Sequence, residues 1–517
     1  MASGKSTLGR LVAQRAGRAF VDLDERVEVR AGLRVHEIFA QHGERTFRQW
    51  EAEALDEVLS SGRPDVVAVG GGALLVRARR LRALEHAVVV ALGAEVEETL
   101  RRAEEQPAQR PLLSHASAVE QVEHLLEQRA PAYAECHARL DTTGRAPDEL
   151  AAQLLELWQR DGVAVAAGEQ SYAVEIGSDI VLARLPEWTR GRSRILLVSD
   201  RNVAPRHAGP VLEALGGPGV VDLIELPAGE IYKTLRTVEG IWQRASALGA
   251  DRSSLFVGLG GGVVTDIAGF AAAGWMRGVP WLAIPTTLLA MVDASVGGKT
   301  AVDLGQAKNC VGAFWQPSAV FCDVKYCATE PARGLSALSE VVKTALIGDP
   351  ELLELLERES AAVLRREPGV TGEIVRRSIR VKARVVGQDA REQGIRAALN
   401  LGHTFGHALE AAAGFERLSH GEAISLGLVA ALRLGQRLAV TPAALVARVT
   451  RLLARLGLPT DLQAEPLDAA AELLGLDKKR KGRRVKFVLV REPGRIEFRN
   501  LELGELTRLA GDLSRSD

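Results

Sequence analysis

Three histidines fall within one short segment, residues 399–422, although the whole chain contains only 10. His403 and His407 are four residues apart in a helix-forming context, so both side chains project from the same face. His420 follows after an alanine-rich stretch of helix and a short connection. Imidazole nitrogens gathered in this way suit a divalent metal such as zinc. The spacing therefore predicts a metal site.

The pair His403 and His407 has the spacing of the HExxH motif of zinc proteases. Thr404 stands where that motif needs its catalytic glutamate, so protease chemistry is disfavoured. Two histidines on one helix are often structural, and the third histidine is what favours a ligand role. A metal-dependent enzyme is the leading hypothesis for this segment.

The residues ASGKST at positions 2–7 form the back half of a phosphate-binding loop. In such a loop, backbone N–H groups at a helix N-terminus bind phosphates, a lysine reaches the β and γ oxygens, and a hydroxyl ligates Mg²⁺. This pattern predicts a site for ATP with Mg²⁺, the latter held by Ser6. The nucleotide-binding residues expected here are Gly4, Lys5, Ser6 and Thr7.

A glycine turn lies in the segment Leu255–Gly269, LFVGLGGGVVTDIAG, between an apolar strand and a helix. Such a turn suits a dinucleotide pyrophosphate, because glycines allow close backbone approach and the helix N-terminus faces the anion. It is not a strict GxGxxG pattern, and by itself it fits a purely structural turn equally well. Lys299, Lys308 and Lys343 also lie in otherwise apolar stretches. Buried lysines need partners, so these three favour an anionic substrate.

The composition is that of a globular protein of two to four domains, with 517 residues, 47% hydrophobic and 25% charged. A net charge of −1 gives no global attraction to nucleic acid or to a membrane. The basic run 477–484, DKKRKGRR, is interpreted as a solvated turn before a strand over Val485–Val490. Four cysteines without CxxC pairing predict reduced thiols. With no secretory signal pattern, we expect a soluble, cytoplasmic protein.

The alternation of elements predicts an α/β protein in several modules. Residues 1–160 alternate strand-like runs at 19–23, 66–69 and 87–92 with helical runs, the last of which begins at Pro147. Residues 161–170 read as a linker, and strand–helix alternation resumes over 171–328. Residues 329–517 are mainly helical. The expected architecture is a P-loop α/β module, a Rossmann-like dinucleotide-binding α/β domain and an α-helical metal-binding domain.

Further motifs follow the first loop in order: DLDE at 22–25, GERTFRQWE at 43–51, VVAVGGG at 66–72, QRPLL at 109–113 and RAPAYAE at 129–135. Together they resemble shikimate kinase over about residues 1–160. The resemblance implies a shikimate-binding set of Asp24, Arg48, Gly70, Gly71, Gly72 and Arg129. It also implies that Asp22 acts near Mg²⁺ and the accepting hydroxyl. Arg110 would neutralise charge on the transferred phosphoryl group.

One departure from that family concerns the first strand and the first P-loop glycine, which do not precede Ser3. We expect that the true start lies upstream. The alternative is that this half folds without a central strand, and it could then be a non-catalytic nucleotide-binding module.

The second half carries PAGEIYKT at 227–234, IPTTLLAMVDASVGGKTAVD at 284–303, SEVVKTALIGD at 339–349 and RAALNLGHTFGH at 396–407. These motifs resemble 3-dehydroquinate synthase across residues 171–500. The resemblance implies that Glu340, His403 and His420 bind Zn²⁺ (or Co²⁺) and leave positions open for substrate. The NAD site it implies comprises Asp200, Asn202, Glu230, Lys233, Gly261, Gly262, Val263, Asp266, Thr286, Thr287 and Lys308. The substrate residues it implies are Asp293, Lys299, Asn309, Lys343, Lys382, Arg396, Asn400, His407, Arg277 on the phosphate, and Lys479.

In that family, a heptulosonate 7-phosphate is transiently oxidised by NAD⁺, loses phosphate, is reduced again and closes to 3-dehydroquinate. The resemblance gives His407 a role in proton movement near the metal. A glycerol-type, metal-dependent alcohol dehydrogenase is the rival for this half, since it shares the fold. Its substrates are not anionic, so the many lysines favour the synthase. A homodimer through the synthase half is a further possibility.

Overall fold

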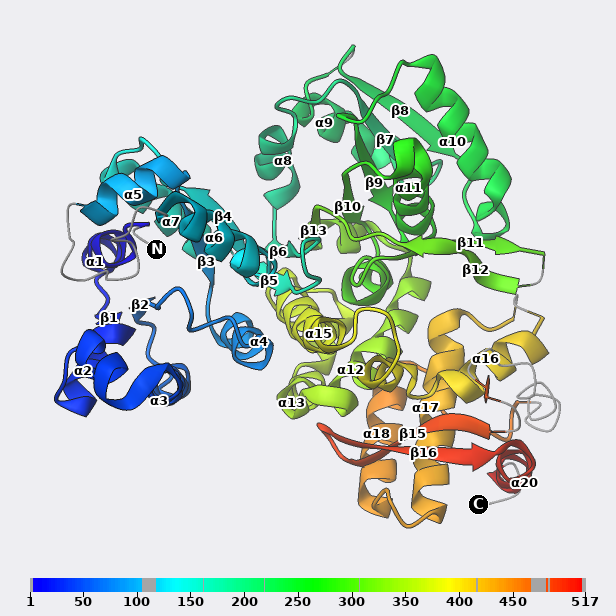
Figure 1. The fold of residues 1–517 in the computed structure, drawn as a ribbon. Helices are drawn as coiled ribbons and strands as arrows, with labels where there is room; N and C mark the ends of the chain where they lie inside the picture. The colour runs from blue at the N-terminus through cyan, green and yellow to red at the C-terminus, as the bar shows by residue number, and fades with distance from the viewer. Residues whose placement is uncertain are drawn as a thin grey trace. The chain divides into compact units, whose positions relative to one another are not determined.

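The computed structural model describes residues 3–104, 118–160, 162–217, 219–305, 307–414, 417–465, 480–481 and 484–513. Contacts divide the chain into two compact units, Met1–Ala173 and Val174–Asp517. Figure 1 labels most of the helices and strands of both units. Within the residues just given, no helix is long and apolar enough to cross a membrane.

The first unit alternates short strands with helices, as expected for an α/β module. In chain order its elements are α1 (Lys5–Ala16), β1 (Phe20–Asp22), α2 (Leu23–Ala31), α3 (Val35–Ser60), β2 (Val66–Ala68), α4 (Arg77–His86), β3 (Val90–Gly93), α5 (Val96–Glu104), α6 (Ala118–Ala134), β4 (Ala138–Asp141), α7 (Pro147–Gln159) and β5 (Gly162–Val165). The strands expected near 20, 67 and 90 and the helix expected from Pro147 are confirmed.

The strands β1 to β4 of the first unit form two separate parallel pairs, β1 with β2 and β3 with β4. Each pair has its own core. Leu23, Phe47 and Leu55 belong to the cluster around α2, α3 and β2, whereas Leu8 and Leu140 join α1 to β4. The carboxyl ends of β1 and β2 therefore lie side by side. A P-loop site is built at these two strand ends.

The segment 162–170, expected as a linker, begins with strand β5. Ala164 and Ala166 pack against Leu84 of α4. The Gly168 N–H donates a hydrogen bond of 3.1 Å to the Glu135 carboxylate. A run of small residues is typical of a linker, which is why the composition predicted one. Here the small side chains instead let the backbone lie close against α4. This segment thus takes part in the packing of the first unit.

The second unit starts with an α/β part. Its elements are β6 (Tyr172–Gly177), α8 (Ile180–Arg184), η3 (Leu185–Trp188), β7 (Ile195–Asp200), α9 (Ala204–Ala214), β8 (Val221–Leu226), η4 (Glu230–Tyr232), α10 (Leu235–Ala247), β9 (Leu255–Gly260), α11 (Gly262–Gly274), η5 (Trp275–Arg277), β10 (Trp281–Pro285), η6 (Ala290–Ala294), β11 (Lys299–Leu304), β12 (Ala307–Phe314), β13 (Ala319–Asp323) and η7 (Val324–Thr329).

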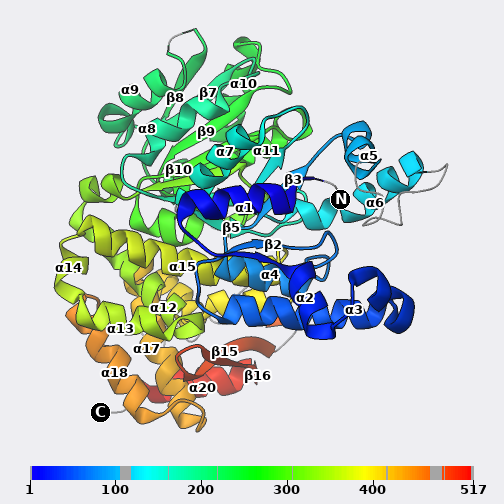
Figure 2. The same cartoon turned by 90° about the vertical axis from the view of Figure 1, so that its left-hand side faces the viewer.

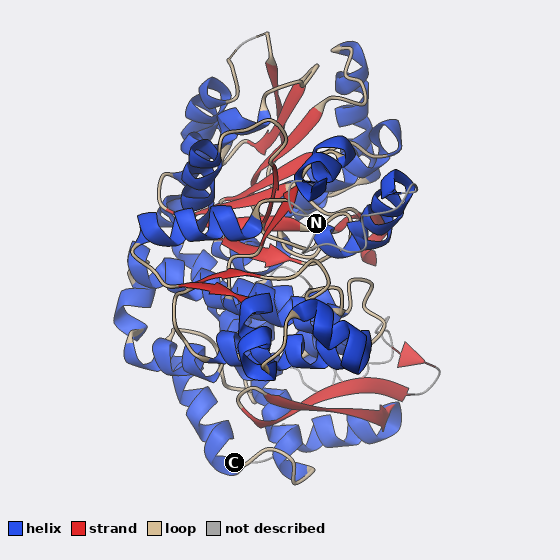
Figure 3. Cartoon of the chain, turned by 60° about the vertical axis from the view of Figure 1, so that its left-hand side comes forward, coloured by secondary structure: helices blue, strands red, loops and turns tan. Residues whose placement is uncertain are grey.

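Within this part the sheet runs in the order β6-β13-β10-β9-β7-β8, and the neighbours from β13 to β8 are parallel. Helices cover both faces, as Figure 3 shows. Ile195 and Leu197 of β7 share a core with residues of α8 and α9. The alternate residues Leu196 and Val198 are also fully buried and point to the other face. The result is a doubly wound sheet, with β11 and β12 as a separate antiparallel ribbon.

The rest of the second unit is mainly helical. It contains η8 (Ala332–Ala337), α12 (Leu338–Gly348), α13 (Pro350–Arg358), α14 (Ser360–Leu364), α15 (Pro368–Gln388), η9 (Ile395–Asn400), α16 (His403–Ala412), α17 (His420–Arg437), α18 (Ala443–Arg455), β14 (Arg480–Lys481), β15 (Arg484–Glu492), β16 (Arg495–Glu502) and α20 (Leu503–Leu513). The strand expected at Val485–Val490 is confirmed as part of β15.

Helix α12 lies at the centre of this helical part, and every residue from Leu338 to Ile347 is buried. A helix that is buried on all sides must pack against neighbours on every side. Those neighbours include α13, α15 and α17, which Figure 2 shows around it. Glu340 and Lys343 are the charged residues on α12, so this element carries charge into the core.

Candidate functional site

Three potential metal ligands meet where α12, α16 and α17 approach one another. Glu340, His403 and His420 each offer a ligand atom, and these atoms lie within 4.8 Å of one another. His403 Nε2 and His420 Nε2 are both 3.3 Å from Glu340 Oε1. Glu340 is 1% exposed and His403 is 8% exposed. One carboxylate and two imidazoles are a donor set that suits Zn²⁺ or Co²⁺, so these residues fit a divalent metal.

The backbone at the start of α16 orients His403. Gly402 precedes this helix with a φ of +78°, a left-handed conformation that favours glycine. His403 Nδ1 is 3.2 Å from the Leu401 carbonyl oxygen. A ring that donates from Nδ1 to a carbonyl leaves Nε2 unprotonated and available as a ligand.

Glycines bring the two histidine-bearing helices together. A Cβ on Gly427 of α17 would lie 2.1 Å from the Gly402 carbonyl oxygen, and a Cβ on Gly406 would lie 2.9 Å from Ile424 Cδ1. The backbones of α16 and α17 therefore touch directly. His403 and His420 are the first residues of these helices. The distance between them therefore depends on this backbone contact.

The charge of Glu340 is stabilised by an ammonium group one turn along α12. Lys343 is 2% exposed, and its ammonium forms an ion pair with Glu340. Burial would raise the pKa of Glu340, but Lys343 and His420 lower it to about 2. The carboxylate is thus anionic at neutral pH, as a metal ligand must be.

A second set of charged residues lies beside this cluster. Lys382 Nζ on α15 donates to Asp293 Oδ1 at 2.5 Å, and Asp293 lies on η6. Burial would raise the pKa of Asp293, but Lys382 and Lys343 lower it to about 2. Arg396, 2% exposed, donates to the Gly297 carbonyl oxygen at 3.1 Å. Asp293, Lys343 and Lys382 therefore lie near Glu340, and Arg396 lies near Lys382.

Two other expected substrate residues meet at a carboxylate that sequence reasoning missed. Lys299 forms an ion pair with Glu392, and Asn400 Nδ2 donates to the same carboxylate at 3.0 Å. Glu392 has a φ of +57°, which is uncommon for a residue other than glycine. A single glutamate in a polar loop gives no local signal of such a role.

The expected NAD residues follow adjacent strands of the sheet. Asp200 ends β7, the Gly261–Val263 turn follows β9, and Thr286 and Thr287 follow β10. The carboxyl ends of parallel strands share one edge. Since β8 lies on one side of β7 and β9 on the other, the order reverses here, and dinucleotides bind at such a switch point. A Cβ on Gly260 would lie 2.7 Å from Val264 Cβ, so the turn needs its glycine.

Lys233 joins the expected NAD residue Asp266 to the expected substrate residue Asn309. Its ammonium donates to Asp266 at 2.6 Å and to Asn309 Oδ1 at 2.5 Å, and Glu230 Oε1 lies 3.9 Å away. Burial raises the pKa of Asp266 to about 6, although Lys233 acts against this. Lys308, expected at the NAD site, donates to Glu410 Oε1 at 2.8 Å.

The remaining residues expected in the synthase half are more scattered. His407 is exposed one turn beyond His403, with ring centroids 5.2 Å apart. Arg277 is exposed on η5, and Asn202 N donates to Asp200 Oδ1 at 2.8 Å. Lys479 lies outside the described residues, as does Arg110 of the first unit.

The first unit brings its expected phosphate-site residues together at the start of α1. Gly4 precedes this helix with a φ of +78°, and Lys5, Ser6 and Thr7 form its first turn. Ser6 Oγ donates to Asp22 Oδ2 at 2.6 Å. The N-terminus of α1 therefore faces the carboxyl end of β1, an arrangement suited to a phosphate and a divalent cation.

The Gly70–Gly72 turn after β2 is enclosed by the other expected shikimate residues. A Cβ on Gly72 would lie 2.4 Å from Arg48 Cζ, one on Gly71 2.9 Å from an Arg129 nitrogen, and one on Gly70 3.1 Å from Asp24 Oδ1. Arg48 also forms an ion pair with Glu51 at 2.8 Å. Burial, followed by Asp22 and Glu51, raises the pKa of Asp24 to about 6.

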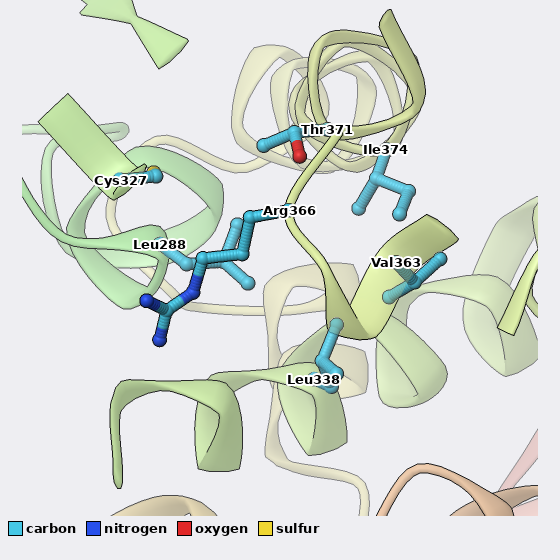
Figure 4. A pocket seen from close by; sticks show the side chains of 7 residues that line it. All are labelled: Leu288, Cys327, Leu338, Val363, Arg366, Thr371 and Ile374. Atoms are coloured by element: carbon cyan, nitrogen blue, oxygen red, sulfur yellow. The ribbon is translucent and has the colours of Figure 1, made fainter. Parts of the chain in front are cut away.

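A small pocket elsewhere in the second unit contains none of these residues. Figure 4 shows its lining, which consists of Leu288, Cys327, Leu338, Val363, Arg366, Thr371 and Ile374. Arg366 donates to the carbonyl oxygens of Glu330 and Pro331, and burial raises the pKa of the Cys327 thiol to about 12. An apolar lining with a protonated thiol does not offer the ligand atoms that Glu340, His403 and His420 offer.

Three family models match parts of the chain. Residues 1–159 match the model for shikimate kinase. Residues 223–337 match the model for the N-terminal part of 3-dehydroquinate synthase, and residues 337–480 match its C-terminal part. Both resemblances expected from the sequence motifs are thereby confirmed.

Individual relatives agree with these models. The 3-dehydroquinate synthase of Laribacter hongkongensis is 42% identical over 342 residues, which cover 64% of this chain and 92% of that protein. A structure of 2-deoxy-scyllo-inosose synthase with carbaglucose-6-phosphate, NAD⁺ and Co²⁺ has a TM-score of 0.62 at 26% identity, covering 68% of this chain and 99% of the other.

A structure of 2-epi-5-epi-valiolone synthase from Streptomyces hygroscopicus subsp. jinggangensis, with NAD⁺ and Zn²⁺ bound, has a TM-score of 0.60 at 29% identity. It covers 66% of this chain and 97% of the other. The chain belongs to the 3-dehydroquinate synthase family and carries a shikimate kinase domain at residues 1–159, so it combines two enzymes of the shikimate pathway.

Proposed function

We propose that the synthase reaction takes place between the ligand cluster of Glu340, His403 and His420 and the strand ends that carry the NAD residues. The observation that carries this proposal is the meeting of three ligand atoms within 4.8 Å beside a buried ion-paired lysine. Two of the structural relatives are described with NAD⁺ and with Co²⁺ or Zn²⁺. When bound, NAD⁺ supplies a hydride acceptor and the divalent metal a Lewis acid for the substrate hydroxyls.

The charged residues of the chain position the sugar acid phosphate in this proposal. Lys343, Lys382 and Arg396 are buried cations at the inner side of the site. Lys299, Asn309, Asn400 and Arg277 supply further groups for the carboxylate and phosphate, and Lys479 is proposed there from the family pattern. Asp293 keeps Lys382 oriented through its 2.5 Å hydrogen bond. His407, exposed beside His403, exchanges a proton with the substrate.

The NAD residues have separable tasks in the same proposal. The backbone N–H groups at Gly261, Gly262 and Val263 face the pyrophosphate at the N-terminus of α11. Asp200 and Asn202 lie after β7, where a ribose hydroxyl can be bound. Thr286, Thr287, Asp266, Lys233 and Glu230 then surround the nicotinamide half. The ammonium of Lys308 donates to Glu410 instead.

In the kinase unit, Gly4, Lys5 and Thr7 bind the nucleotide phosphates, and Ser6 with Asp22 serves Mg²⁺ and the accepting hydroxyl. Asp24, Arg48, Arg129 and the Gly70–Gly72 turn bind shikimate, which is supported by their mutual approach around that turn. Arg110 is proposed from the family pattern to neutralise phosphoryl charge. A homodimer through the synthase half and a cytoplasmic location, where ATP and NAD⁺ are both present, complete the proposal.

The decisive experiment follows NADH absorbance and phosphate release together during turnover of the heptulosonate 7-phosphate. We expect phosphate release with flat NADH absorbance, because the cofactor is reduced and oxidised again within one turnover. NADH rising in step with oxidation of a simple alcohol such as glycerol, without phosphate release, would contradict the assignment. In parallel, His403→Ala should lose bound metal by elemental analysis, while shikimate phosphorylation continues.

A further inference from the structure

Glu410 is a buried carboxylate next to the ligand cluster of Glu340, His403 and His420, but it is not one of those three ligands. It lies on α16 seven residues after His403 and is 6% exposed. Its Oε2 is 3.5 Å from His420 Nδ1, and its Oε1 accepts the 2.8 Å hydrogen bond from Lys308. Spacings of three and seven residues on a helix bring Glu410 to the face of His407 and His403, which is the one sequence signal for it.

The two nitrogens of His420 face different groups. Nε2 is 3.3 Å from Glu340 Oε1, on the side of the ligand cluster, whereas Nδ1 faces Glu410. A ligand histidine whose second nitrogen donates to a carboxylate has its tautomer and ring orientation fixed. His403 has the Leu401 carbonyl oxygen for the same purpose. For His420, the Glu410 carboxylate is the group that faces Nδ1.

Lys308 reaches this carboxylate from another part of the unit. It lies on β12, which pairs with β11 in the ribbon beside the α/β sheet. A buried carboxylate needs a compensating charge, and Lys308 gives Glu410 one that does not depend on His420. The orientation of a residue in the helical part is thereby connected to a strand of the NAD-binding part.

We propose that Glu410 is a positioning residue of the synthase site, which holds His420 with Nε2 facing Glu340 and His403, and that Lys308 fixes Glu410. This inference rests on the proposed metal site. In this proposal Lys308 does not contact NAD. It acts on the metal site by holding Glu410 in place. The proposal also accounts for the charge of Glu410 without a second metal, although His407, Glu410 and His420 also have ligand atoms within 4.8 Å of one another.

The first test measures affinity for Zn²⁺ by competition with a chelator, using the full chain. Glu410→Ala should weaken binding by about 10- to 100-fold, the usual effect of losing an outer partner of a ligand histidine. Glu410→Gln keeps the shape and an accepting oxygen, so its loss should be smaller. Glu351→Ala, which removes an exposed carboxylate on α13, is the matched control and should bind as the unsubstituted chain does.

The second test separates positioning from folding. With Co²⁺ in the site, the visible absorption spectrum reports ligand geometry, and we expect Glu410→Ala to change it while the ligands remain. If Glu410→Ala does not fold, a shifted spectrum in Glu410→Gln supports the same conclusion. Lys308→Met should weaken Zn²⁺ binding in the unsubstituted chain but add nothing in the Glu410→Ala background, because it acts through Glu410.

Two results distinguish failure of this inference from failure of the proposed metal site. If His403→Ala keeps full Zn²⁺ affinity, the ligand cluster itself is wrongly assigned. If His403→Ala loses Zn²⁺ and both Glu410→Ala and Glu410→Gln bind it as the unsubstituted chain does, only the positioning role is overturned. Two equivalents of Zn²⁺ per chain, one of them lost in Glu410→Ala, would replace positioning by a second ligand site.

Discussion

The carboxylate of Glu392 forms an ion pair with the ammonium of Lys299, one of the lysines proposed to bind the anionic substrate. The same carboxylate accepts a hydrogen bond from Asn400, and the Glu392 backbone has a φ of +57°. An internal anion therefore engages two groups that are proposed to bind the substrate. If they do bind it, the substrate competes with Glu392 for them, and this competition is open to measurement.

Glu392→Gln should lower the KM of the synthase for its sugar acid phosphate by about 2- to 5-fold, because a partly exposed ion pair contributes up to about 1 kcal/mol. We expect kcat to change less than KM, since Glu392 does not touch the ligand cluster. Steady-state kinetics with both variants, Glu392→Gln and Lys299→Met, check this. Lys299→Met should raise KM, and a raised KM in Glu392→Gln as well would show that Glu392 assists binding.

Lys5→Ala should abolish ATP-dependent phosphorylation of shikimate and leave 3-dehydroquinate formation unchanged. Lys5 lies in the first turn of α1 in the first unit, whereas the ligand cluster lies wholly in the second. Coupled assays of both activities on one preparation check this expectation. Loss of both activities in a folded variant would indicate that the two units depend on each other.

Asp24→Asn should stabilise the first unit at neutral pH. Burial raises the pKa of Asp24 from 3.8 to about 6, so the folded state binds the proton more tightly than the unfolded state does. Its free energy of unfolding therefore falls as pH rises from about 4 to about 6, by on the order of 1–3 kcal/mol. Calorimetry of the full chain at pH 4 and pH 7.5 should show a gain for Asp24→Asn mainly at pH 7.5. Asp56→Asn, at an exposed ion pair, is the control.

A kinase fragment that ends at residue 170 should be more stable than one that ends at residue 160. The longer fragment keeps Ala164 and Ala166 against Leu84 and the Gly168 N–H on the Glu135 carboxylate. A hydrogen bond to a charged group contributes about 1.5–3 kcal/mol. Thermal unfolding of the two fragments compares them. Equal melting temperatures would mean that residues 162–170 act as a plain linker.

The sequence predicted those parts of the site that depend on local spacing. The four-residue spacing of His403 and His407 places them on one helix face. The apolar run before Gly261 and the residues after it predict the observed strand, turn and helix. Glu340 came only from the family resemblance, because one glutamate in an apolar helix gives no metal signal. Glu392 and Glu410 were missed for a related reason. Their lysine partners, Lys299 and Lys308, lie 93 and 102 residues away along the chain, and only the fold brings them together.

The direct backbone contact between α16 and α17 has a consequence for inherited variation. A Cβ on Gly427 would lie 2.1 Å from the Gly402 carbonyl oxygen, so even alanine must push the two helices apart. Gly427 touches neither substrate nor cofactor in the proposed site. A substitution there would nevertheless act as a loss-of-function allele through the spacing of His403 and His420, and a screen that considered only residues facing the substrate would overlook it.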